Sequence, residues 1–168
     1  MNCPGCGFDN IQGNDACEEC GMDLRSLDIP LPQEGLQQTI LEDPLENLHP
    51  LNPLVVAPDT PIEQAIRLMK QANQGSVFVV EGNELAGILT ERDLLMKVAV
   101  RPIDLKRTPV SNLMTHDPVA LKAGDALAYA LNNMSVGRYR HIPIVRDGRL
   151  TSFVSVRGVL RYIAEKLG

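Results

Sequence analysis

From residue 44 onward, apolar side chains first recur at helical spacing and then form short β-branched runs, and this succession occurs twice. In its first occurrence, one helix face is marked by apolar residues at Ile62, Ala65, Ile66 and Met69. The preceding segment predicts the helix start, with Thr60 as the cap and Glu63 closing a capping box around a proline at the first helical position. Gly75 is the predicted end of this helix.

The remaining elements follow from apolar runs separated by short turns. The first pattern predicts strands over 77–80 and 85–89 around a turn at 81–83, then a helix from 91 to about 100. The second pattern predicts a helix over 125–134, strands over 142–145 and 150–154 around a turn at 146–148, and a helix over 156–166. Each copy therefore consists of an extended entry, a helix, two strands and a helix.

The two patterns are copies of one unit, because a shift of 65 positions superimposes them without a gap. Ala65 and Met69, for example, fall on Ala130 and Met134. We therefore predict one repeat over 44–106 and a second over 107–168. One such unit has too little core to be stable alone, so the two repeats are expected to pack sheet against sheet. The predicted fold class is α/β in the broad sense, with helices and strands in each repeat (α+β).

Residues 44–167, about three quarters of the chain, resemble a pair of cystathionine-β-synthase (CBS) domains, often called a Bateman module. The segments that carry the resemblance, by their order and spacing, are 59–65 (DTPIEQA), 87–93 (GILTERD), 112–115 (NLMT) and 140–145 (RHIPIV). The resemblance implies two repeats related by a pseudo-twofold axis, adenosine-type ligands in the clefts between them, and association into a flat homodimer.

All four cysteines lie before residue 21, in two Cys-x-x-Cys pairs: Cys3, Cys6, Cys17 and Cys20. Zn²⁺ favours four thiolates in a tetrahedron, and each pair can place both of its sulfurs on one ion. Gly7 and Gly21 follow the pairs, where a sharp turn favours a residue with positive φ. We predict a structural zinc ribbon over 1–25, joined by a linker over 26–43. Two disulfides, or iron in a rubredoxin-like site, are the alternatives.

Composition narrows the function. The chain is 44% hydrophobic and 22% charged with a net charge of −5, which is typical of a globular protein and argues against a general nucleic-acid binder. The ribbon itself is acidic, so we expect it to contact an unidentified protein partner, or to pack on the paired repeats of its own chain, rather than to contact phosphate backbones. No apolar run is long enough for a membrane helix and no signal peptide is visible, so we expect a cytoplasmic protein without membrane contact.

An enzymatic role is disfavoured by the sequence. No cysteine lies outside the ribbon, and no nucleophile–base pair, paired carboxylates or Walker-type loop stands at a suggestive spacing. Four cysteine ligands would leave no open position on the metal, so the metal is not expected to be catalytic. We therefore expect a non-enzymatic regulatory protein.

The resemblance also implies a ligand site. The first repeat matches the family signature in full at Gly87–Asp93, which implies that Asp93 accepts hydrogen bonds from the ribose hydroxyls and that Thr90 lies near the sugar and phosphate. The second repeat keeps the hydroxyl at Ser155 but has Gly158 in place of the carboxylate. The second cleft is therefore expected to be empty or weak.

Basic residues gather in the second repeat, whereas the carboxylate Asp93 lies in the first. Arg138, Arg140 and His141 precede the first strand of the second repeat, and Arg157 follows its last strand. By resemblance, these bases would meet the phosphates of a ligand held by Asp93. The complete set of predicted ligand residues is Ile88, Thr90, Asp93, Val119, Ala120, Arg138, Arg140, His141, Pro143 and Arg157, with Val119 and Ala120 walling the adenine.

Simpler explanations exist for the same residues. Thr90 and Asp93 have the spacing of an ordinary capping box. The arginines are also compatible with a solvated face, and His141 with a partly buried core residue. The leading hypothesis is an adenine-nucleotide sensor that signals to a protein partner. The competing hypothesis is a ligand-free adaptor that dimerises through the paired repeats.

Overall fold

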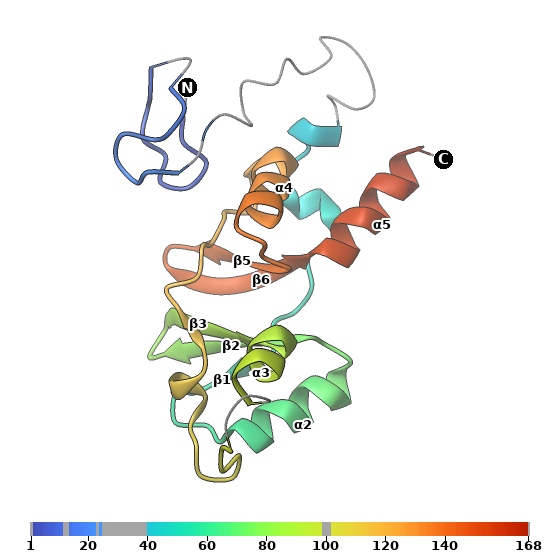
Figure 1. The fold of residues 1–168 in the computed structure, drawn as a ribbon. Coiled ribbons are helices and arrows are strands. Elements are labelled where there is room, and N and C mark those ends of the chain that lie inside the picture. The colour runs from blue at the N-terminus through green and yellow to red at the C-terminus, as the bar shows by residue number, and fades with distance from the viewer. Residues whose placement is uncertain (1, 12–13, 23, 25–39, 99–101, 168) are drawn as a thin grey trace. The chain divides into compact units, whose positions relative to one another are not determined.

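The computed structural model describes residues 2–11, 14–22, 24, 40–98 and 102–167 (Figure 1). Its 3-10 helices (η), strands and α-helices from residue 45 onward are η2 Leu45–Leu48, β1 Val55–Val56, α2 Ile62–Ala72, β2 Ser76–Glu81, β3 Glu84–Thr90, α3 Glu91–Val98, η3 Val110–Asn112, β4 Thr115–His116, α4 Leu127–Val136, β5 His141–Arg146, β6 Arg149–Ser155 and α5 Val156–Leu167. The helices and strands predicted for both repeats are confirmed, with ends that differ by one or two residues. The predicted end of α3, residues 99 and 100, lies outside the described residues.

Two short strands that the hydrophobic pattern did not reveal complete the larger sheet. Its strand order is β1-β2-β3-β4, with β1 parallel to β2 and the other neighbours antiparallel. β5 and β6 form a separate two-stranded sheet. Strands of two residues, such as β1 and β4, are too short to show a period of two, which is why the sequence did not predict them.

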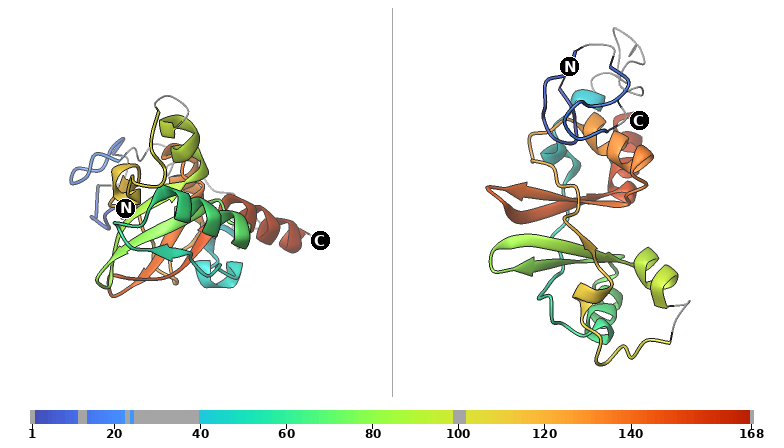
Figure 2. Two further views of the ribbon diagram at one scale, coloured as in Figure 1. Left: turned by 90° about the horizontal axis from the view of Figure 1, so that it is seen from below. Right: turned by 60° about the vertical axis from the view of Figure 1, so that its left-hand side comes forward.

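The larger sheet buries both of its faces, as the alternation of side chains along β2 requires. On one face, Val77 and Val79 join a core that includes Ile62 and Met69 from α2. On the other face, Phe78 packs against Phe153 of β6, with ring centroids 5.1 Å apart. Figures 1 and 2 show α2 and α3 on one side of this sheet and the β5–β6 hairpin on the other. The predicted sheet-against-sheet packing is confirmed.

The entry segment of each repeat packs with the other repeat. The entry segment of the second repeat packs against the first repeat: the backbone N–H of Ile62 donates to the carbonyl of Thr108 at 3.0 Å, and Val110 is fully buried in the core beside α2. The entry segment of the first repeat packs against the second: the backbone N–H of Leu45 donates to the carbonyl of Asp125 at 2.9 Å, just before α4. The chain accordingly divides into two compact units, 1–49 with 124–140 and 155–168, and 50–123 with 141–154.

The domain boundaries drawn from the sequence stay a prediction. They place the ribbon at 1–25, a linker at 26–43, and repeats at 44–106 and 107–168. Most of the predicted linker, residues 26–39, lies outside the described residues.

The predicted capping of α2 is wrong. Pro61, not Thr60, is the N-cap residue, and it makes no side-chain cap hydrogen bond. The backbone N–H groups of Ile62 and Glu63 instead donate to carbonyls of the 104–108 segment, each at 3.0 Å. Because that segment satisfies the helix start, a side-chain cap is not needed. At the other end, Asn73 rather than Gly75 takes the left-handed conformation, with φ 52°.

Candidate functional site

The two Cys-x-x-Cys pairs fold in the same way. In the first, the backbone N–H of Cys3 donates to the carbonyl of Phe8 at 2.8 Å, and that of Gly7 donates to the carbonyl of Cys3 at 2.8 Å. The same two bonds recur fourteen residues later, starting at Cys17, at 2.8 and 2.9 Å. Gly7 and Gly21 have φ of 76° and 69°, as their positions in the sequence predict. Each pair is therefore a turn that holds its two sulfurs on one side.

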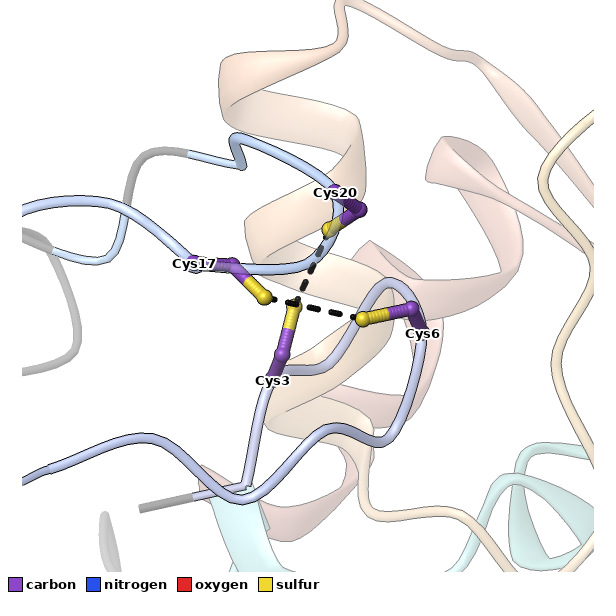
Figure 3. A group of neighbouring side chains, drawn as sticks. All are labelled: Cys3, Cys6, Cys17 and Cys20. Atoms are coloured by element: carbon purple, nitrogen blue, oxygen red, sulfur yellow. Dashed lines mark hydrogen bonds between the residues drawn. The ribbon is translucent and has the colours of Figure 1, made fainter.

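The four cysteine sulfurs lie close together and point toward one another (Figure 3). They all lie within 4.8 Å of one another, with Cys3 and Cys20 at 3.5 Å and Cys6 and Cys17 at 3.6 Å. All four cysteines are free, and these distances are far longer than a disulfide bond of about 2.05 Å. A tetrahedral zinc ion with Zn–S bonds of about 2.3 Å separates its sulfurs by about 3.8 Å. The four side chains therefore fit a tetrahedral thiolate-bound metal.

Electrostatics at the sulfurs also favours a bound cation. Burial of Cys17 opposes its ionisation, but backbone N–H donors from Cys20 and Glu19 and the Asn10 side chain outweigh it and lower the pKa of Cys17 to about 6. At Cys20, the backbone N–H of Met22 favours the thiolate, yet desolvation and the three neighbouring sulfurs raise the pKa to about 12. Ionisation of one cysteine therefore disfavours ionisation of its neighbours. A divalent cation bound to all four would remove that repulsion.

At the start of α3, Thr90 and Asp93 form a reciprocal cap. The backbone N–H and the hydroxyl of Thr90 donate to Oδ2 of Asp93 at 3.0 and 2.6 Å, and the backbone N–H of Asp93 donates to the Thr90 hydroxyl at 3.2 Å. The capping box proposed as the simpler explanation is therefore present. A cap does not exhaust a carboxylate, because two oxygens offer about four acceptor positions.

The second oxygen of Asp93 also has partners, which the sequence analysis missed. Nζ of Lys97 lies 3.1 Å from Oδ1, and the Thr115 hydroxyl donates to Oδ1 at 3.5 Å. Lys97 donates in addition to the carbonyl of Leu113 at 2.6 Å. Lys97 could have been found from its spacing of four residues after Asp93 on a helix. Thr115 could not, because it arrives on β4 from the entry of the other repeat.

The comparison with known families decides what these repeats are. The model of the CBS domain family matches twice, over residues 48–100 and 110–165. This chain belongs to the CBS domain family. Its internal repeat is a tandem of two CBS domains.

Individual relatives agree with this assignment. An uncharacterized 17.7 kDa protein of Acidianus ambivalens is 34% identical over 113 residues, which cover 66% of this chain and 67% of that protein. The CBS domain-containing protein YhcV of Bacillus subtilis is 35% identical over 101 residues, 60% of this chain and 71% of YhcV. The crystal structure of a CBS-domain containing protein from Agrobacterium tumefaciens aligns with a TM-score of 0.67 and 27% identity, covering 73% of this chain and 95% of that one.

Other relatives are much longer than this chain. CBSCBSPB5 of Arabidopsis thaliana is 33% identical over 104 residues, which is 61% of this chain but 19% of that protein. The chain thus spans about a fifth of the length of such plant relatives.

The second CBS repeat keeps part of the cap. The hydroxyl oxygen of Ser155 accepts the backbone N–H of Gly158 at 3.2 Å, in the position where Thr90 accepts from Asp93. A Cβ added to Gly158 would lie 3.6 Å from that oxygen, which is ordinary contact. The second repeat therefore lacks the carboxylate, although its backbone has room for a Cβ at this position.

The predicted ligand residues divide between the two compact units. Ile88, Thr90, Asp93, Val119, Ala120, His141 and Pro143 belong to the unit that contains β1–β6, and Arg138, Arg140 and Arg157 to the other. All three arginines are exposed. The convergence of Asp93 with Arg138 and Arg140 stays a prediction.

Within the first group the residues differ in exposure. Ile88 and Pro143 are buried, and the Ile88 side chain packs with Phe78 and Phe153. Val119 and Ala120 are half-buried in the loop before Leu121. His141 is half-buried with its ring 5.9 Å from that of Phe153, as the core alternative for this residue predicts.

Two further expectations concern function more broadly. None of the helices that the structure describes combines the length and hydropathy needed to cross a bilayer. The expectation that the chain has no catalytic activity stays a prediction.

Proposed function

We propose that this CBS-domain protein is a non-catalytic regulatory sensor that binds one adenosine-type ligand per chain: AMP, ADP, ATP or a molecule like S-adenosylmethionine. The observation that carries the proposal is the Asp93 carboxylate, which Thr90 holds in place and which stays 16% exposed at the start of α3. The second repeat has Gly158 at the same position. One repeat therefore offers a fixed acceptor for a sugar diol, and the other does not.

The chemistry of each residue type supports this role. A carboxylate accepts two hydrogen bonds, and the two ribose hydroxyls can donate them. Arg138, Arg140 and Arg157 are exposed and would supply charge-assisted hydrogen bonds to phosphates. His141 would add a donor beside them. Val119, Ala120, Ile88 and Pro143 would form the apolar surroundings of the adenine.

Signalling would follow from differential affinity. A ligand that contacts both CBS repeats shifts their arrangement only by as much as it binds one arrangement better than another. The number of arginines engaged would then distinguish ligands by their phosphate count.

One observation favours the competing function of a ligand-free adaptor. Both oxygens of Asp93 already have partners within the chain: Thr90 on Oδ2, and Lys97 with Thr115 on Oδ1. A ribose would have to share Oδ1 or displace Lys97. This ion pair is partly exposed, and such pairs contribute at most about 1 kcal/mol, so its displacement is compatible with ligand binding.

Calorimetric titration separates the two functions. The full chain is titrated with AMP, ADP, ATP and S-adenosylmethionine. The sensor predicts saturable binding of at least one of them with one site per chain, whereas the adaptor binds none. Mass spectrometry of small molecules that co-purify with the native protein adds a search that does not depend on a chosen panel.

We further propose that Cys3, Cys6, Cys17 and Cys20 hold a structural zinc ion and that the ribbon docks on a protein partner. The mutual distances of the sulfurs support a tetrahedral metal, and an all-thiolate set leaves no position open for catalysis. Elemental analysis of the purified chain should give one zinc per chain in a colourless protein. A coloured protein that contains iron would instead support the rubredoxin-like alternative.

We also propose that the CBS pair forms a homodimer. The last helix of each repeat carries an exposed leucine at the same repeat position, Leu95 at 70% and Leu160 at 61% exposure. Exposed apolar side chains in equivalent places support a self-complementary interface. Light scattering should give twice the chain mass, and Leu95→Glu combined with Leu160→Glu should give the mass of a monomer.

A further inference from the structure

Asn10 connects the two halves of the cysteine site. It is a polar residue that is only 4% exposed. Its Nδ2 donates to the carbonyl of Phe8 at 2.9 Å and to Sγ of Cys17 at 3.5 Å. Its Oδ1 accepts the backbone N–H of Glu18 at 2.9 Å. One side chain thus binds the end of the first cysteine turn, and both a sulfur and a backbone amide of the second.

In the described part of the other half of the site, the equivalent position holds an apolar residue. The fourteen-residue shift that superimposes the two cysteine turns places Leu24 opposite Asn10. Leu24 is fully buried and packs with Cys3 and Cys17 in an apolar cluster that includes Met22. Equivalent positions of the two turns therefore hold an apolar residue, Leu24, and a hydrogen-bonding one, Asn10. A simple structural ribbon could use an apolar side chain at both positions.

We propose that Asn10 is a positioning residue for the metal: it fixes the Cys17 sulfur through an N–H···S bond and locks the two cysteine turns in the register that one ion requires. The proposal rests on the metal site proposed above and goes beyond the identity of its four ligands. Asn10 does not contact the ion.

The physical reason lies in the geometry of the amide. An asparagine has two N–H donors and one carbonyl acceptor, and all three types of bond are used here in fixed directions. The bond from the Glu18 N–H to Oδ1 of Asn10 holds the backbone directly after Cys17. Asn10 therefore restrains Cys17 at two points, at its sulfur and at the adjacent backbone. Partners in the outer shell of metal sites typically change metal affinity by about 10–100-fold when they are removed.

Two substitutions separate the role of the Asn10 N–H donor to the Cys17 sulfur from that of the Asn10 oxygen that accepts the Glu18 N–H. Asn10→Ala removes all three bonds. Asn10→Asp keeps the shape and the acceptor for Glu18 N–H, but it turns a carboxylate oxygen toward the Cys17 sulfur and the Phe8 carbonyl. Asn14→Ala is the matched control, because the Asn14 amide donates to the Glu18 carboxylate at 2.8 Å in the same loop without contacting a sulfur.

The experiment measures zinc affinity of the full chain by competition with a chromophoric chelator, and the absorption spectrum of the Co²⁺-substituted protein. We expect Asn14→Ala to match the wild type. We expect Asn10→Ala to weaken zinc binding by about tenfold or more, and Asn10→Asp to weaken it further. The sulfur-to-cobalt charge-transfer band should shift in both Asn10 variants while the tetrahedral d–d bands persist, because the ligands stay the same and one loses its N–H donor.

Several results would overturn the proposal. Affinity of Asn10→Asp equal to the wild type would mean that only the acceptor matters and that the sulfur bond has no role. Asn10→Ala within twofold of the wild type would remove any positioning role. A wild-type chain that binds neither Zn²⁺ nor Co²⁺ would refute the metal site itself. That failure is distinguishable, because it occurs before any substitution is compared.

Discussion

The two CBS repeats share one backbone plan but differ at the head of their last helix. In the first, Thr90 and Asp93 cap α3 together, and Lys97 and Thr115 bind the remaining carboxylate oxygen. In the second, the Ser155 hydroxyl accepts the amide of Gly158 at the start of α5, where the backbone N–H of Val156 donates to the carbonyl of Arg140. A helix of this kind therefore begins well without a carboxylate. What Asp93 adds beyond the cap is a fixed, partly exposed negative charge, and this is the feature a ligand would use.

One further position in the last helix holds different residues, with different contacts, in the two repeats. Lys97 and Tyr162 coincide under the 65-residue shift, and each bonds to a segment outside its own repeat. Lys97 donates to the carbonyl of Leu113, and the Tyr162 hydroxyl donates to the carboxylate of Asp43. Lys97 has the additional bond to Asp93. Both residues therefore anchor the last helix of their repeat, and of the two only Lys97 also contacts a residue of the proposed ligand site.

Asp93→Ala should have the largest effect on this asymmetry. It removes the proposed acceptor of both ribose hydroxyls, and hydrogen bonds to a charged group contribute about 1.5–3 kcal/mol each, so the loss of two should lower affinity by at least about 100-fold. Calorimetric titration measures it. The matched control is Asp104→Ala, which removes an exposed carboxylate of the same unit that pairs only with nearby residues. Equal affinity of Asp93→Ala and the wild type would refute the assignment of the site.

Gly158→Asp should give the second repeat what it lacks. The backbone has room, since an added Cβ would lie 3.6 Å from the Ser155 oxygen. A reciprocal cap should form and raise the stability of the chain by a few tenths of a kcal/mol to about 1 kcal/mol. If a carboxylate is the missing element, the titration should show a second, weaker site per chain. Gly158→Asn is the control that caps without the charge, and a second site in both variants would contradict the carboxylate's role.

Lys97→Met should tighten ligand binding modestly. It keeps most of the length of the side chain and removes the cation that contacts Oδ1 of Asp93, together with its bond to the carbonyl of Leu113. Exposed ion pairs contribute about 0.2–1 kcal/mol, so affinity should rise by about 1.5–5-fold and depend less on salt concentration. Titration at two ionic strengths measures both effects. A weaker ligand affinity in Lys97→Met would instead place Lys97 among the residues that bind the ligand.

Tyr162→Phe should leave ligand binding unchanged and act on stability alone. Burial, followed by the hydrogen bond to Asp43, raises the pKa of Tyr162 above its usual value near 10. Because the folded pKa is the higher one, the contribution of the neutral hydroxyl is complete below pH 10 and is lost as the pH rises through the folded pKa. Tyr162→Phe should lower stability at neutral pH and flatten its alkaline decline in urea unfolding. An unchanged alkaline slope would contradict this anchoring role.

Much of the fold could be predicted from the sequence, because long periodic segments and an internal repeat are strong signals. The helices and the four longer strands are examples. The exchange of entry segments could not be predicted, since Thr108 and Asp125 contribute backbone carbonyls and not recognisable side chains. For the same reason the predicted Thr60 cap is wrong.

The residues of the two candidate sites could be predicted from the sequence to different extents. The four cysteines could be predicted as one site, because their spacing leaves few other arrangements. Asn10 could not be, since an asparagine between two cysteine pairs has no distinctive spacing. At the proposed ligand site, the capping pair of Thr90 and Asp93 could be predicted from the motif. The contact of Thr115 with Asp93 depends on strand pairing across the repeats, which a local pattern does not reveal.

The central claim is that one adenosine-type ligand binds each chain through the carboxylate of the first CBS repeat. A crystal structure of the full chain grown with the nucleotide that binds most tightly tests it most directly. We expect both ribose hydroxyls within hydrogen-bond distance of Asp93, phosphates on Arg138 and Arg140, and no ligand beside Gly158. A nucleotide bound beside Gly158, or one bound away from Asp93, would contradict the account.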